Sequence, residues 1–96
     1  MKKEEVLQIL HEHEAELRAQ GVKSLYLFGS VARGDNRPDS DADFLVEFTR
    51  MPTLFDLGGL YTFLSQLLRC EIDLGTADSL RPEFRDEVMK EAIRAA

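Results

Sequence analysis

The strongest constraint on the fold is the alternation at residues 41–48, where every second side chain is apolar. A period of two is the period of a β-strand, because successive side chains point to opposite faces of a sheet. One face then carries only apolar side chains and is predicted to pack on a core: Ala42, Phe44, Val46 and Phe48. The other face carries Asp41, Asp43, Leu45 and Glu47. The segment is therefore predicted to be a strand with two aspartates on one side.

Asp41 and Asp43 form the first candidate site. Two carboxylates this close repel each other unless a cation lies between them. Mg²⁺ takes oxygen ligands and is commonly held by a few carboxylates together with substrate phosphates. The alternative interpretation is an acidic strand end exposed to water, since Asp is common beside turns.

A Gly-Ser turn precedes this pair. Residues 25–28 are apolar on both faces and predict a strand that is covered on both sides. The run leads directly into Gly29 and Ser30. Glycine allows a ligand to approach the backbone closely, and Ser30 offers a hydroxyl at the start of a short helix that ends at Arg33. The turn is a candidate phosphate cradle, and Arg33 and Arg37 either contact phosphate or anchor the loop.

A third carboxylate is predicted on residues 70–74. Cys70, Ile72 and Leu74 alternate with Glu71 and Asp73, so Asp73 faces away from the apolar side. If this strand pairs beside residues 41–48, Asp73 joins the other two aspartates. Cys70 is interpreted as a packing residue.

Besides the short helix, three long helices are expected, at residues 2–20, 54–68 and 79–96, each with an apolar stripe. In the first, His13 lies on the apolar side and is interpreted as a packing residue. In the second, Phe55 and Phe63 fall outside the main stripe. They either form apolar surface for a partner or are wrapped by a small core. The third is predicted to present a broad apolar side.

Composition limits the classes of partner. The 96 residues are expected to form one domain, 1–96, without a membrane span or secretory signal. One cysteine cannot form an internal disulfide, which fits a cytoplasmic protein. With 18 acidic against 12 basic residues and a net charge of −6, direct binding of nucleic acid is not expected. A bound polyphosphate would need positive charge from metal ions or from a basic partner, and a basic protein partner is the simplest inference.

Three carboxylates beside a phosphate-binding turn suit phosphoryl transfer assisted by two Mg²⁺ ions about 3.5–4 Å apart. In this hypothesis Asp41 and Asp43 hold the metals on the nucleotide phosphates. Asp73 lies by the attacking hydroxyl, as a metal ligand or as the proton acceptor. Gly29 and Ser30 hold the terminal phosphates.

These residues resemble the minimal nucleotidyltransferases of the DNA polymerase β superfamily. The family motif is Gly-Ser, ten residues, then Asp-x-Asp, and the chain carries it from Gly29-Ser30 to Asp41 and Asp43. The segments 32–34, 37–40 and 72–74 are also similar to the family, so the resemblance covers nearly the whole chain. It implies an α/β (α+β) domain with a three-stranded mixed sheet flanked by helices, in the order helix, strand, short helix, strand, helix, strand, helix.

The resemblance also implies a function. Small members of the family transfer AMP from ATP, with Mg²⁺, to a hydroxyl of a partner. They act as antitoxins of HEPN-domain ribonuclease toxins, and the acceptor is a tyrosine near the toxin's active site. A cytoplasmic hetero-oligomer with such a toxin is therefore expected. A domain of this size leaves no room to hold the acceptor, which a partner must bring.

Two other classes of function are considered. A catalytically silent antitoxin would neutralise its toxin by stoichiometric binding alone, and a regulatory subunit would only bind nucleotide. The complete set of three carboxylates argues against both, because neither function needs three acids on one face.

Overall fold

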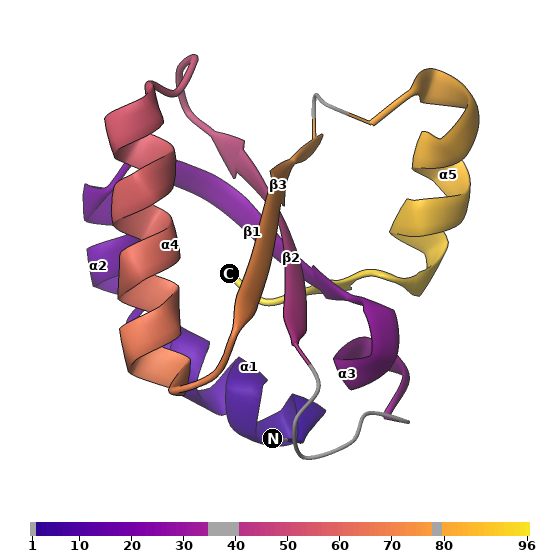
Figure 1. Cartoon of the computed structure of the whole chain (residues 1–96), viewed down its shortest axis with the longest axis horizontal. Helices are drawn as coiled ribbons and strands as arrows, with labels where there is room; N and C mark the ends of the chain where they lie inside the picture. Colours follow the sequence, from indigo (N-terminus) through magenta and orange to yellow (C-terminus); the bar gives the residue numbers. More distant parts are fainter. Residues whose placement is uncertain (1, 35–40, 78–79) are drawn as a thin grey trace.

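The computed structural model describes residues 2–34, 41–77 and 80–96, and Figure 1 shows its helices and strands. In chain order these are α1 (Lys3–Glu12), α2 (Glu14–Ala19), β1 (Val22–Phe28), α3 (Gly29–Arg33), β2 (Ala42–Phe48), α4 (Leu54–Leu68), β3 (Ile72–Thr76), α5 (Pro82–Glu91) and β4 (Ile93–Arg94). No helix within the described ranges is long and apolar enough to cross a membrane.

The strands form one mixed sheet in the order β3-β2-β1-β4. β1 runs antiparallel to β2 and β4, and β2 runs parallel to β3. The mixed α/β fold is confirmed, but the predicted number of three strands is wrong. The fourth strand is formed by Ile93 and Arg94, which the sequence pattern assigns to the last helix.

Helix α5 ends at Glu91, before the predicted residue 96, because the residues that follow it form backbone hydrogen bonds with the edge of β1. Ala92 is already extended, with φ −73° and ψ 142°. Beyond it, the backbone N–H groups of Ala95 and Ala96 donate to the carbonyl oxygen of Leu25. An unpaired edge of backbone groups is a liability in a sheet, and this short strand covers it.

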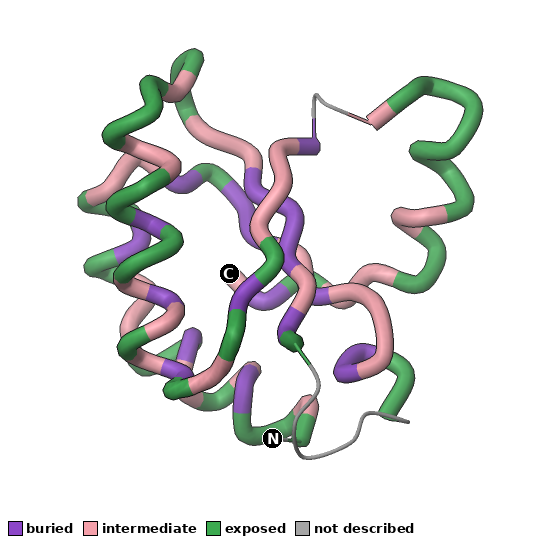
Figure 2. The backbone as a smooth tube through the Cα atoms, in the orientation of Figure 1, coloured by how far each residue is buried: buried purple, intermediate pink, exposed green. Residues whose placement is uncertain are grey.

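The alternation at residues 41–48 is confirmed and sets the two faces of the sheet. Ala42, Phe44 and Val46 are buried in a core formed with α1, α2 and α4. Figure 2 colours the buried residues along the backbone purple. Asp43 and Glu47 lie on the opposite face and are half-buried. The helices thus cover one face of β2 and leave the aspartates on the other.

The predicted helix at residues 2–20 is two helices, because the backbone leaves helical geometry at His13 (φ −113°, ψ 22°). The Nδ1 atom of His13 lies 2.8 Å from the carbonyl oxygen of Ile9. Its ring meets the edge of Phe63, with 6.3 Å between centroids. His13 is half-buried, in agreement with its interpretation as a packing residue.

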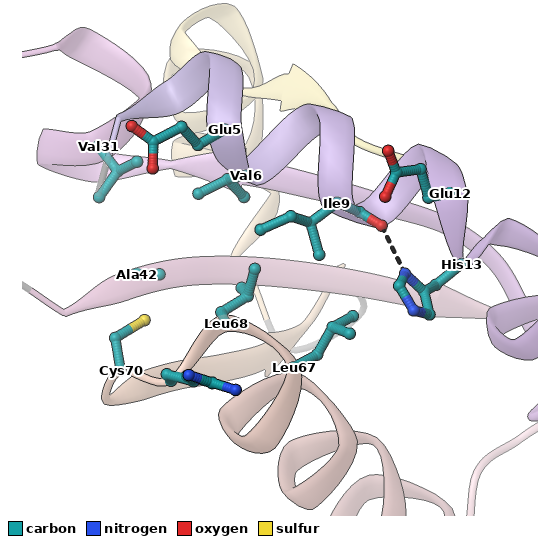
Figure 3. A pocket seen from close by; sticks show the side chains of 11 residues that line it. Glu5, Val6, Ile9, Glu12, His13, Val31, Ala42, Leu67, Leu68 and Cys70 are labelled. Carbon is teal, nitrogen blue, oxygen red and sulfur yellow. Dashed lines mark hydrogen bonds between the residues drawn. The ribbon is translucent and has the colours of Figure 1, made fainter.

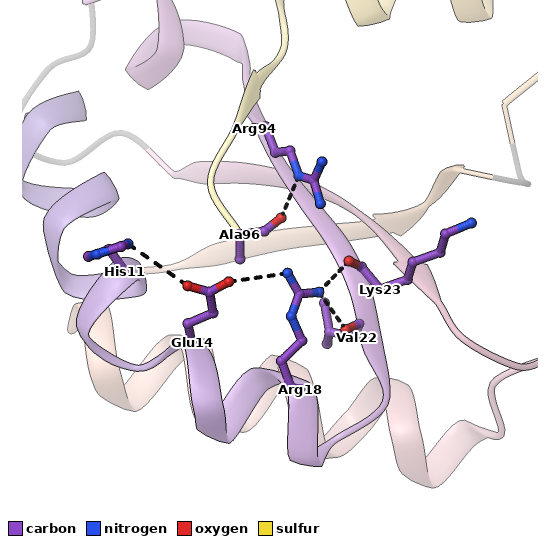
Figure 4. Close-up of polar contacts among 7 residues, drawn as sticks. All are labelled: His11, Glu14, Arg18, Val22, Lys23, Arg94 and Ala96. Carbon is purple, nitrogen blue, oxygen red and sulfur yellow. Dashed lines mark hydrogen bonds and ion pairs between the residues drawn. The ribbon is translucent and has the colours of Figure 1, made fainter.

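Arg18 fixes α2 to the start of β1 (Figure 4). Its guanidinium donates to the carbonyl oxygen of Val22 at 3.0 Å and to that of Lys23, and it pairs with Glu14 at 3.3 Å. These contacts hold the helix pair against the strand that leads into the Gly-Ser turn.

The bounds predicted for α4 agree with the structure, and its first turn carries a capping box. The Thr53 hydroxyl accepts from the backbone N–H of Asp56 at 3.2 Å, and the Asp56 carboxylate accepts from the backbone N–H of Thr53 at 2.8 Å. The two phenylalanines outside the stripe have different environments. Phe63 packs against the core, whereas Phe55 is 92% exposed.

Helix α5 stands apart from the sheet (Figure 1). None of its residues is buried, and Phe84 is 52% exposed, so the predicted apolar side is not packed on the core. An ion pair of 3.4 Å between Glu91 and Arg33 joins α5 to α3.

Candidate active site

The register of the sheet brings the predicted site residues together at one end of β2. Asp43 lies opposite Phe28, the last residue of β1, and opposite Asp73 on β3. The neighbouring pair has the same parallel register, with Ala42 opposite Ile72. Asp43 is therefore flanked by the Gly-Ser turn on one side and by Asp73 on the other.

The three carboxylates share one electrostatic environment. The pKa of Asp43 is raised above its ordinary value, chiefly by burial and then by the negative charges of Asp73 and Asp41. The positive charge of Arg33 acts in the opposite direction. A cation at this position would relieve the repulsion among the carboxylates.

Gly29 lies directly against Asp43. Its φ of +76° is in the left-handed region that favours glycine. A Cβ built on Gly29 would also lie 2.2 Å from Oδ2 of Asp43, far inside van der Waals contact. The turn therefore needs glycine for its conformation and for the space that the carboxylate occupies.

Ser30 follows in the first turn of α3 and is half-buried. The carbonyl oxygen of Ser30 accepts from the backbone N–H of Gly34 at 3.0 Å, and Gly34 ends this short helix with φ +80°. The turn between β1 and α3 is thus closed locally and lies beside Asp43, because Phe28 pairs with that residue.

Of the two arginines predicted to contact phosphate or anchor the loop, the structure describes one. Arg33 is exposed, lies near enough to influence the pKa of Asp43, and forms the ion pair with Glu91. Arg37 lies outside the described residues. Sequence reasoning missed Glu91, which is 58 residues from Arg33 along the chain, and no spacing pattern could have paired them.

The chemistry of the donors fits a hard divalent ion. Carboxylate oxygens are the ligands that Mg²⁺ prefers, and Asp41 and Asp73 are exposed enough to meet a hydrated ion or a phosphate. Within residues 2–34, 41–77 and 80–96, no three Asp, Glu, His or Cys side chains are gathered closely enough to form a metal site. Mg²⁺ held by one or two carboxylates commonly takes its other ligands from water and substrate phosphates.

A cavity of about 640 Å³ lies on the helix-covered side of the sheet (Figure 3). It is lined by Ile9, Ala42, Leu68 and Cys70, among others, and by none of the described site residues. Ala42 reaches it because its side chain alternates with that of Asp43. Burial raises the pKa of the Cys70 thiol, which disfavours the thiolate and fits a packing role.

The chain matches the family described as nucleotidyltransferase domain over residues 4–95. It is 37% identical to the protein adenylyltransferase MntA of Thermococcus cleftensis, with 94% of this chain and 92% of the relative covered. A solved structure of a candidate minimal nucleotidyltransferase has 35% identity and a TM-score of 0.83, and covers 97% of this chain and 95% of the other.

The fold also occurs in a complex of a tri-AMPylated HEPN toxin from Shewanella oneidensis with MNT antitoxin. The TM-score is 0.65 at 19% identity, and the match covers 94% of this chain and 71% of the other. At this identity the likeness concerns the fold alone. The family match, the sequence relative and the solved structure of 35% identity all point to the same family. The chain therefore belongs to the nucleotidyltransferase domain family, among its minimal nucleotidyltransferases.

Proposed function

We propose that this chain is a protein adenylyltransferase that transfers AMP from ATP to a tyrosine hydroxyl of a HEPN-type ribonuclease toxin, and that it acts as the toxin's antitoxin. In this reaction the acceptor oxygen bonds to the α-phosphorus of ATP. The bond to pyrophosphate breaks, and the hydroxyl proton is lost. The 37% identity to a protein adenylyltransferase and the fold shared with an antitoxin of an AMPylated toxin support this proposal.

The single observation that carries the proposal is the register of Asp43 between Phe28 and Asp73. This register brings the candidate phosphate-binding turn, Asp43 and Asp73 to one end of the sheet. The negative charge of Asp41 also acts on the Asp43 carboxyl. Neither stoichiometric masking nor packing of the fold requires this juxtaposition.

We assign the residues as follows. Asp41 and Asp43 would hold two Mg²⁺ ions on the nucleotide phosphates, and Asp73 would lie by the acceptor hydroxyl, as a metal ligand or as the proton acceptor. Gly29 and Ser30 would hold the terminal phosphates, with Arg33 and Arg37 as further phosphate contacts. When bound, Mg²⁺ neutralises the phosphates and makes the hydroxyl more acidic.

We also propose that residues 1–96 act as one domain, that the chain forms a hetero-oligomer with its toxin, and that it works in the cytoplasm. One sheet and one core cluster support the first point. The single cysteine, which cannot form an internal disulfide, supports the last.

The test uses the protein encoded beside this chain, mixed with the chain, Mg²⁺ and ATP. Intact mass of that protein is measured with the wild type, with Asp41→Asn/Asp43→Asn, and with Glu47→Gln as the matched control. Glu47 lies on the same strand face but accepts a hydrogen bond from Ser24 at 3.1 Å, away from the site. A glutamine oxygen can accept the same bond.

We expect the mass to rise by whole AMP units with the wild type and with Glu47→Gln, and not with the double variant. If the mass stays unchanged while both the wild type and the double variant silence the toxin, the chain is a binding antitoxin and the proposal is wrong.

A further inference from the structure

We propose that Glu91, the last residue of α5, is a positioning residue of the candidate active site. Its carboxylate holds the guanidinium of Arg33 beside the Gly-Ser turn, where the guanidinium would meet the phosphates of ATP. This role rests on the proposed function, in which Arg33 contacts phosphate. It adds the C-terminal segment of the chain, which carries none of the sequence motifs, to the groups that bind the nucleotide.

The pairing of β4 with β1 places Glu91 beside the turn. In this antiparallel pair Ile93 lies opposite Leu27. Carried two residues further, the same register brings Glu91 level with Gly29, the residue that lies against Asp43. The short strand β4 therefore does more than cover an edge of the sheet, because it also sets where α5 ends.

The contact between Glu91 and Arg33 does not result from close packing of α5. Oε2 of Glu91 lies 3.4 Å from Nη1 of Arg33, although none of the residues of α5 is buried. The end of α5 thus meets α3 through side chains that are 58% and 48% exposed (Figure 1). An ion pair this exposed contributes little to stability. Its main effect is to fix where a long side chain points.

Arg33 is connected to the site in two ways. It is the last residue of α3, the helix that begins at Gly29. Burial and the neighbouring carboxylates raise the pKa of Asp43, whereas the positive charge of Arg33 lowers it. The charge therefore acts on Asp43 while the guanidinium is paired with Glu91. The ion pair holds this positive charge near the site without cancelling it there.

An arginine that is held in advance should bind phosphate more tightly. A long side chain loses rotamer freedom when a ligand orders it, and order supplied by the protein lowers this cost. The need is large here, because the chain has a net charge of −6 and a polyphosphate would meet three aspartates. The opposite role, in which Glu91 competes with phosphate for Arg33, predicts the opposite change in ATP affinity.

Titration calorimetry of the whole chain with ATP and Mg²⁺ tests this role without the toxin. The wild type is compared with Glu91→Gln, Arg33→Gln and the double variant. We expect the dissociation constant of ATP to rise at least about tenfold in Arg33→Gln and about three- to tenfold in Glu91→Gln. The double variant should bind no more weakly than Arg33→Gln, because Glu91 acts through Arg33.

Glu87→Gln is the matched control. Glu87 is exposed on α5 one turn before Glu91, so the variant removes the same charge and leaves the ion pair in place. Its dissociation constant should stay unchanged or fall slightly. The melting temperature of Glu91→Gln should be nearly that of the wild type, because the pair is exposed.

Several results would overturn the proposal: an unchanged or lower dissociation constant in Glu91→Gln, an equal rise in Glu87→Gln, or additive effects in the double variant. A rise that merely follows a loss of folded protein would overturn it too. Failure of the proposed function looks different, since the calorimetric cycle would then behave as expected while no AMP reaches the toxin. A wild type that binds no ATP would contradict both.

Discussion

Gly29 is the residue at which the backbone and the candidate chemistry meet. Its positive φ and the missing Cβ are separate requirements, and only the second concerns Asp43. Gly34 separates the two requirements, because it has a similar φ of +80° but no atom within 4 Å of where its Cβ would lie.

Gly29→Ala is expected to destabilise the fold by about 1–2 kcal/mol from left-handed strain and to reduce AMP transfer at least about 100-fold by displacing Asp43. Gly34→Ala should bring the same strain and retain most of the activity. Thermal unfolding and the initial transfer rate of both variants test this. Equal losses of activity would mean that strain, rather than the contact with Asp43, explains the effect.

The raised pKa of Asp43 predicts how stability depends on pH. Because the folded protein binds this proton more tightly than the unfolded chain, stability is lost as pH rises from the unfolded value near 3.8 through the higher folded pKa. Asp43→Asn removes the repulsion among the carboxylates and should raise the melting temperature at pH 7. The gain should disappear toward pH 3.

Mg²⁺ provides the companion measurement. It should raise the melting temperature of the wild type at pH 7 and have a smaller effect on Asp43→Asn. If Asp43→Asn is less stable than the wild type at pH 7, the carboxylates at this site do not destabilise the fold by repulsion, and the assignment is contradicted.

At the scale of elements, the strand β2 was the most predictable part of the molecule. Its alternation located the core side of Ala42, Phe44 and Val46 and the opposite side of Asp43. The bounds of α4 were equally clear, because Leu60, Leu64 and Leu68 repeat at helical spacing. Periodicity reports which face is buried, and both elements bury one face.

Other elements could not be predicted from the sequence. The two residues of β4 are too few to show a period, and their apolar neighbours extend the pattern of α5. The break at His13 interrupts a stripe that continues on both sides. The register of Asp43 with Asp73 depends on parallel pairing across the connection through α4, which spacing along the chain does not reveal.

The capping box of α4 predicts a local loss of stability without loss of activity. Thr53→Ala removes the acceptor for the backbone N–H of Asp56 and should lower the free energy of unfolding by about 1 kcal/mol. For a domain of this size, that corresponds to a fall of about 4–8 °C in melting temperature. Transfer activity at 25 °C should be unchanged, because Thr53 follows the end of β2 that is remote from Asp43. A loss of activity larger than the loss of folded protein would contradict this separation.

At the scale of the whole molecule, the sheet separates two surfaces. The carboxylates and the Gly-Ser turn lie on one side, and α4 lies on the other. The chain as a whole carries a net charge of −6, which would favour an encounter with a basic partner.

Salt should therefore slow the association of this acidic chain with a basic partner. We expect the association rate with the toxin to fall by about tenfold or more between low and high salt, since opposite charges steer the encounter. The dissociation rate of the same complex should change less, because salt acts mainly on the long-range steering of the encounter. Surface plasmon resonance in the same buffers provides both rates. A toxin association rate that is independent of salt would contradict the charge argument.

The most direct test of the central claim follows the phosphorus atoms of ATP. The chain and the protein encoded beside it are incubated with Mg²⁺ and ATP labelled at either the α- or the γ-phosphate, and the label on that protein is counted. We predict label from the α-position only, lost in Asp41→Asn/Asp43→Asn and kept in Glu47→Gln. Label from the γ-position would indicate a kinase reaction, and no label from either would indicate a silent site; both results contradict adenylyl transfer by the three carboxylates.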